Sequence, residues 1–114
     1  MQQITKNIFV EADWPGANVS CVSTTDGLVL IDTPYYPSHA VTWKKIVESK
    51  GAIKYLINTE PHHDHYMGAF FFTVPAVAHE KTRESMAVTD IKQILAILAH
   101  NNPDDISQIH SHSF

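Results

Sequence analysis

The stretch N-T-E-P-H-H-D-H-Y-M-G, residues 58–68, holds the densest group of metal-binding and proton-carrying side chains in the sequence. Glu60 and His62 are two positions apart, so in an extended segment their side chains point to the same side. Pro61 between them fixes its own φ and keeps the preceding residue extended, which favours this arrangement. The spacing therefore predicts that two possible metal ligands, Glu60 and His62, lie on the same side of the segment.

Asp64 and His65 follow at the point where the chain is expected to turn into a helix. Aspartate is favoured there because free N–H groups and the helix dipole stabilise negative charge. The same field disfavours imidazolium, which keeps the ring of His65 neutral with a lone pair free for a metal. His63 should face away from Glu60 and His62, and we interpret it as a surface or supporting residue. The alternative is a solvent-exposed loop whose histidines gain and lose protons but bind no metal.

Carboxylate oxygens and imidazole nitrogens suit Zn²⁺, Fe²⁺ or Mn²⁺. The predicted metal ligands are Glu60, His62, Asp64 and His65. Their position favours a site over a solvated loop, because an apolar strand is predicted just before them and a turn with glycine just after. Ends of strands are where α/β folds place their ligands.

The hydrophobic pattern around this stretch predicts a mostly mixed sheet with helices on one face. A strong hairpin signal, Asp26-Gly27, separates two of the strands. We expect strands at 7–12, 18–25, 28–33, 53–59 and 74–79. We expect a helix capped by Ser38 and ending near Ser49, a short helix or turn at 66–72, and a long helix at about 80–99.

Composition excludes several classes of protein. The chain has 114 residues, 44% hydrophobic and 18% charged, which is an ordinary globular balance. A formal charge of −4 and the absence of a Lys/Arg block give no reason to expect nucleic acid or an anionic membrane. The single cysteine, Cys21, allows no internal disulfide and is expected to be buried. With no signal-peptide pattern and no apolar run of bilayer length, we expect a cytoplasmic protein.

The motif and its context resemble the metallo-β-lactamase-fold hydrolases. That family has the signature H-x-H-x-D-H after a strand, preceded by a strand that ends in Leu-Ile-Asp. Here G-L-V-L-I-D-T (27–33), Y-L-I-N-T (55–59) and E-P-H-H-D-H-Y-M-G (60–68) stand in the same order. V-P-A-V-A-H-E-K-T-R-E (74–84) is similar to the strand and helix that commonly follow, so the resemblance covers roughly residues 5 to 90.

The resemblance implies a role for each position of the motif. His62 would bind a first metal, and Asp64 and His65 a second, with Asp64 also orienting the attacking water as the catalytic residue. Glu60 stands where the family has its first histidine. A carboxylate can replace imidazole on zinc, but it lowers the Lewis acidity of the metal and favours a harder ion or a single occupied site. Asp32 is expected to support the loop from below. The implied cofactor is Zn²⁺, one or two ions, with Fe or Mn as alternatives.

The implied fold is α/β: half of a four-layer αββα metallo-β-lactamase-like sandwich, as a single domain over residues 1–114 that lacks the second half. The later ligands of the family lie in that half. His110 and His112 are too near the end to replace them, and we interpret them as an exposed tail. Half a sandwich leaves one apolar sheet face uncovered, which predicts a homo-oligomer or a partner on that face.

Three functions compete. The first is a metal-dependent hydrolase in which a metal-bound hydroxide attacks an ester, amide, thioester or phosphoester. The second is a non-catalytic metal-binding or remnant module of the same fold. The third is a structural α/β domain with an incidental histidine-rich loop. The intact His62, Asp64 and His65 favour the first, and the missing half favours the second for this chain alone. The substrate is a small molecule of unknown identity, because the fold hosts many chemistries.

Overall fold

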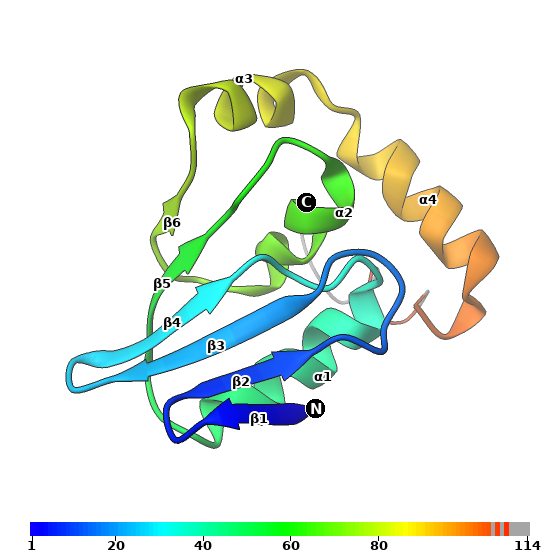
Figure 1. Ribbon diagram of the computed structural model, residues 1–114. Coiled ribbons are helices and arrows are strands. Elements are labelled where there is room, and N and C mark those ends of the chain that lie inside the picture. Colours follow the sequence, from blue (N-terminus) through cyan, green and yellow to red (C-terminus); the bar gives the residue numbers. More distant parts are fainter. Residues whose placement is uncertain (106, 108, 110–114) are drawn as a thin grey trace.

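The computed structural model describes residues 1–105, 107 and 109. Its centre is a six-stranded sheet in the order β1-β2-β3-β4-β5-β6 (Figure 1). The strands are β1 (Gln2–Thr5), β2 (Ile8–Glu11), β3 (Val19–Thr24), β4 (Gly27–Ile31), β5 (Ile53–Ile57) and β6 (Ala76–Val77). The first four strands pair antiparallel, and β4, β5 and β6 pair parallel. The predicted mixed sheet is confirmed.

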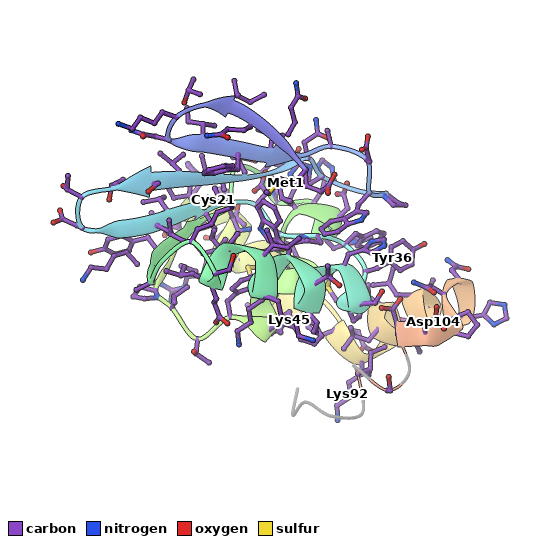
Figure 2. All side chains as sticks on the ribbon, turned by 90° about the horizontal axis from the view of Figure 1, so that it is seen from below. Met1, Cys21, Tyr36, Lys45, Lys92 and Asp104 are labelled. Carbon is purple, nitrogen blue, oxygen red and sulfur yellow. The ribbon has the colours of Figure 1, made fainter. Side chains whose placement is uncertain are left out.

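Helices lie on one side of this sheet. They are α1 (Pro37–Glu48), α2 (His63–Tyr66), α3 (Glu80–Val88) and α4 (Ile91–Asn101), with the short 3₁₀ helices η1 (Met67–Phe71) and η2 (Pro103–Asp105). Figure 2 shows the sheet as one layer and α1 as a second layer beneath it. None of the helices in the described part of the chain is long and apolar enough to cross a bilayer. The expected arrangement, an α/β half-sandwich with helices on one face, is confirmed.

Alternation along the strands builds the core between these layers. On β3 and β4 the buried residues are Val19, Cys21, Leu28 and Leu30, and they pack against α1. Trp43 of α1 is fully buried among them. Burial raises the pKa of the Cys21 thiol, so this cysteine is a core residue, as predicted.

The start of α1 differs from the prediction. Its N-cap is Tyr36, which makes no side-chain capping bond, so Ser38 is not the cap. Instead the buried carboxylate of Asp105 accepts a hydrogen bond from the backbone N–H of Ser38. A free N–H group and the helix dipole at this position both favour a carboxylate. The cap is supplied from η2, a segment remote in the sequence, and a local motif could not reveal it.

Two further predictions need correction, and one strand was missed. The expected long helix over 80–99 is two helices, because Asp90 accepts a hydrogen bond from the backbone N–H of Gln93 and caps α4 anew. The strand expected at 74–79 pairs over only two residues. β1 was not predicted, because its sequence is short and its residues are all exposed.

The second face of the sheet carries no helix in the part of the chain that the structure describes. Register places two rows of side chains on it, one through Val22, Val29 and Tyr55 and one through Ile31, Ile57 and Val77. Tyr55, Ile57 and Val77 are 48%, 36% and 53% exposed. The expected apolar face is therefore present, and no described helix covers it.

Candidate metal centre

The cluster loop, residues 58–65, begins where β5 ends. β4 and β5 are parallel, with Ile31 opposite Ile57, so the residues that follow the two strands meet at one edge of the sheet. Asp32 and Thr59 are therefore neighbours, although 27 positions separate them. α2 and η1 then carry the chain away from this edge (Figure 1).

Asp32 is the support beneath the loop. Its carboxylate accepts hydrogen bonds from the backbone N–H of Thr59 at 2.8 Å, from the Thr59 hydroxyl at 2.6 Å, and from Nδ1 of His65 at 2.9 Å. It is 4% exposed and has a φ of 58°, in the left-handed region that aspartate tolerates better than most residues. The predicted supporting role of Asp32 is what this geometry shows.

The backbone of the loop is held by residues that the sequence analysis did not identify. The carbonyl of His65 accepts hydrogen bonds from the backbone N–H of Thr33 at 2.9 Å, the Thr33 hydroxyl at 3.0 Å and the Asn58 amide at 3.1 Å. Thr33 and Asn58 are buried. Their signal in the sequence is a polar residue one or two positions after an apolar strand, in I-D-T and I-N-T.

The imidazole of His65 is oriented from both sides. Asp32 holds Nδ1, and Nε2 lies 2.7 Å from Oε1 of Glu60. A carboxylate on one ring nitrogen fixes the tautomer and aims the other nitrogen, as in metal sites. Nε2 is therefore the ring atom that His65 offers to a metal, and in this structure it contacts Glu60 instead.

Glu60 also binds His62, through a hydrogen bond between its second carboxylate oxygen and Nδ1 of that ring. The two side chains lie on the same side of the segment, as predicted. The hydrogen bond lowers the pKa of Glu60 and raises the pKa of His62, because each partner favours the charged form of the other. A proton on His62 therefore competes with a metal for this ring, and Nε2 is the ring nitrogen that the bond to Glu60 leaves open.

Asp64 is the fourth predicted ligand, and its carboxylate lies at the edge of the group. Its Oδ2 is 3.9 Å from Nε2 of His65, and no other described residue donates a hydrogen bond to it. Its backbone carbonyl accepts from Ala17 at 3.4 Å. The Asp64 side chain is thus held in place by its helix and left free to bind.

The donor set suits a divalent metal, but the donor atoms of Glu60, His62 and His65 are engaged in hydrogen bonds or ion pairs with one another. Four ligands at zinc-like bond lengths lie roughly 3.4 Å apart, and the 2.7 Å and 3.9 Å distances from Nε2 of His65 fall on either side of that value. Among residues 1–105, 107 and 109, no three His, Cys, Asp or Glu side chains already form a metal site. Glu60 would have to exchange its two imidazole contacts for the ion.

Two other described histidines lie apart from this group. His63 packs against Tyr35 with ring centroids 5.2 Å apart and points away, as predicted. His79 caps α3 by accepting a hydrogen bond from the backbone N–H of Lys81. His110 and His112 lie outside the described residues.

Comparison with known proteins gives likenesses to solved structures. The DIM-1 metallo-β-lactamase exposed to ceftazidime superposes with a TM-score of 0.68 at 16% identity, over 75% of this chain and 45% of that one. A B3 metallo-β-lactamase described as the first with an active-site glutamic acid has a TM-score of 0.61 at 28% identity, over 74% and 34% of the two chains. A metallo-β-lactamase from Pontibacter korlensis has a TM-score of 0.54 at 27% identity, over 90% and 47%.

These likenesses show that the chain has part of the metallo-β-lactamase fold, as the motif predicted. The chain spans less than half of the length of these solved structures. No family profile matches the sequence, and no curated protein does.

Proposed function

We propose that this chain, which has part of the metallo-β-lactamase fold, provides half of the active site of a metal-dependent hydrolase. The single observation that carries the proposal is His65, held at Nδ1 by the buried Asp32 and directed at Glu60 through Nε2. A histidine fixed in this way is suited to bind a metal. The likeness to solved metallo-β-lactamases supports the same reading.

The ion we propose is zinc, one or two per chain, with Fe or Mn as alternatives. Glu60, His62, Asp64 and His65 would hold it. A bound metal supplies Lewis acidity, which makes water a nucleophile near neutral pH and polarises the bond to be cleaved. Asp64, whose carboxylate accepts no hydrogen bond from a described residue, would accept a proton from water and orient it.

Glu60 in place of histidine is compatible with this function. The neighbour with an active-site glutamic acid supports a glutamate at such a site in this fold. An added carboxylate reduces the positive charge felt by water, so we propose a weaker Lewis acid than an all-imidazole site would give. The proposed substrates are esters, amides, thioesters or phosphoesters.

Metal binding tests the proposal first. Elemental analysis after dialysis against zinc should find about one ion per chain, and His62→Ala/His65→Ala should reduce zinc affinity at least about tenfold. The matched control is His63→Ala/His100→Ala, which removes two histidines that are not among the predicted ligands. Zinc bound equally by both double variants would contradict the assignment of the ligands.

Turnover separates the enzyme from the non-catalytic alternative. The zinc-loaded chain is incubated with chromogenic esters, thioesters, phosphoesters and a lactam, beside Asp64→Asn. Hydrolysis that disappears in Asp64→Asn supports the enzyme. Zinc bound without turnover on any of these substrates supports the alternative, a metal-binding module that needs the rest of the fold.

We also propose that a second copy of this chain covers the open sheet face. The rows through Val22, Val29 and Tyr55 and through Ile31, Ile57 and Val77 are apolar and carry no charge. Because each copy has a formal charge of −4, contact through an uncharged face brings the fewest like charges together. The matched structures also have more chain outside the match than inside it, enough for a second layer.

Light scattering at micromolar concentration should therefore give twice the mass of one chain, and Ile57→Glu should return it to one. The introduced carboxylates would be buried unpaired in the interface, which is strongly unfavourable. The control is Val88→Glu, at a residue that is 86% exposed and lies on α3, outside the sheet. A well-folded monomer of the unchanged chain would contradict the proposal.

A further inference from the structure

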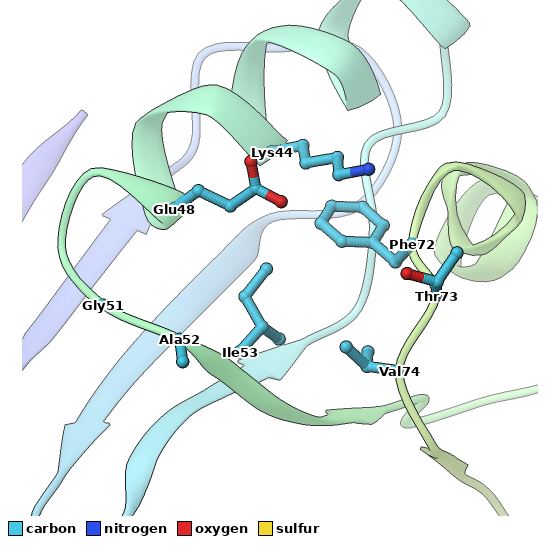
Figure 3. A pocket seen from close by; sticks show the side chains of 8 residues that line it. All are labelled: Lys44, Glu48, Gly51, Ala52, Ile53, Phe72, Thr73 and Val74. Carbon is cyan, nitrogen blue, oxygen red and sulfur yellow. The ribbon is translucent and has the colours of Figure 1, made fainter.

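A pocket lies at the opposite end of β5 from the cluster loop (Figure 3). Its volume is about 380 Å³, which is within the range of small-ligand sites. It opens between α1 and segment 72–74, where Gly51 and Ala52 leave the entrance uncrowded. β5 has five residues, so the length of this strand, about 17 Å, separates the pocket from the cluster.

Three apolar side chains form one wall of this pocket, whose remaining lining is largely polar. Ile53, Phe72 and Val74 form this wall, and the ring of Phe72 belongs to the core, with 8% of the residue exposed. Ile53 and Val74 pack against the same core from β5 and from the segment before β6. An apolar group of a ligand would therefore contact side chains that are fixed by the core, and binding there would release water from apolar surface.

The rim carries one group of each charge. Lys44 and Glu48 are four positions apart on α1, and so they stand on the same side of the helix. In Figure 3 the side chain of Lys44 ends above the ring of Phe72 and that of Glu48 ends beside it. Neither forms an ion pair with the other or with any other described residue. The hydroxyl of Thr73 is also at the pocket and makes no hydrogen bond within the described residues.

We propose that this pocket binds a small zwitterion, with an ammonium and a carboxylate beside an apolar group, which is the chemistry of an apolar α-amino acid. Lys44 would pair with the carboxylate, Glu48 with the ammonium, and the apolar group would lie on Phe72. A ligand with only one charge leaves one of the two rim residues without a partner. A dianion would be repelled by Glu48, and a dication by Lys44. Complementary charge on both sides selects the zwitterion.

The pocket is independent of the metal centre. None of its residues belongs to the cluster loop, and its lining comes from α1, the start of β5 and segment 72–74. The proposal therefore stands whether or not the chain binds zinc. Its test can be made on the metal-free chain.

Titration of the metal-free chain with L-phenylalanine, followed by NMR shifts of Phe72 and Ile53, tests the proposal. A ligand of this size in an open pocket should bind with a dissociation constant on the order of 1 mM. Hydrocinnamate lacks the ammonium and phenethylamine lacks the carboxylate, and each should bind at least about threefold more weakly. Equal binding of all three compounds, or no saturation by roughly 10 mM phenylalanine, would overturn the proposal.

Two variants assign the charges. Lys44→Gln should remove the preference for phenylalanine over phenethylamine, and Glu48→Gln the preference over hydrocinnamate. Lys45→Gln is the matched control, because Lys45 is exposed on the same helix and does not line the pocket. These variants are on the surface of α1, so folding should be preserved. The same loss in Lys45→Gln would mean that only the general charge of the helix matters, which would overturn the assignment.

Discussion

Asp32→Ala should lower the free energy of unfolding by about 3 kcal/mol. The carboxylate of Asp32 accepts three hydrogen bonds, two from Thr59 and one from His65, and it is almost fully buried. Its removal leaves those donors without a partner in a place where water cannot easily replace it. Alanine also fits the φ of 58° less well than aspartate does. Urea denaturation measures the loss.

Two variants separate these causes. Asp32→Asn keeps a residue that tolerates the left-handed region and can still accept from the N–H of Thr59. Its amide cannot accept from both the Thr59 hydroxyl and His65, so it should be destabilised by less, about 2 kcal/mol. Asp26→Ala removes an exposed carboxylate from the β3–β4 turn and should cost under about 0.5 kcal/mol. An Asp32→Ala variant as stable as Asp26→Ala would contradict the supporting role.

The same change should weaken zinc binding. Without Asp32, no carboxylate holds Nδ1 of His65, so the ring can rotate and either nitrogen can carry the proton. Loss of such a supporting residue typically costs 10–100-fold, so we expect a drop of roughly tenfold in zinc affinity. Unchanged zinc affinity in a folded Asp32→Ala would mean that His65 is not a ligand.

The candidate donors could be named from the sequence because they are contiguous, and their role as ligands stays a prediction. Glu60, His62, Asp64 and His65 fall in one loop, and a two-residue spacing already says which side chains share a side. The supporting role of Asp32 could be predicted because this residue follows an apolar strand, in a stretch that resembles a known family. Strand periods are likewise local, which is why β2 to β5 were predicted within two residues.

What the sequence could not give depends on contacts between remote residues. Asp105 caps α1 although 67 positions separate it from Ser38, and the residues around Ser38 contain no pattern that predicts this contact. The break between α3 and α4 rests on Asp90, a capping residue inside an otherwise helical pattern. The contacts among Glu60, His62 and His65 also depend on which side-chain conformers form, and a spacing argument does not address these.

Gly68→Ala should destabilise the chain by about 2 kcal/mol, although alanine normally stabilises a helix relative to glycine. Gly68 lies in η1, directly after the cluster, against the loop that follows β4. A Cβ there would lie 2.6 Å from the carbonyl oxygen of Pro34 and 2.9 Å from Cβ of Thr33. Both neighbours are backbone or close to it and cannot move aside cheaply. Crowding should therefore outweigh the gain in helix propensity, and urea denaturation would show it.

The crowding should also reach the metal site, because Thr33 donates two hydrogen bonds to the carbonyl of His65. Gly51→Ala provides the contrast. Its added Cβ meets only ordinary contacts with Leu28 at 3.7 Å, but its φ of 154° is strained for alanine. Gly51→Ala should lose stability and keep zinc affinity, whereas Gly68→Ala should lose both. A Gly68→Ala variant more stable than the unchanged chain would show that propensity prevails, and that η1 does not press on the support of His65.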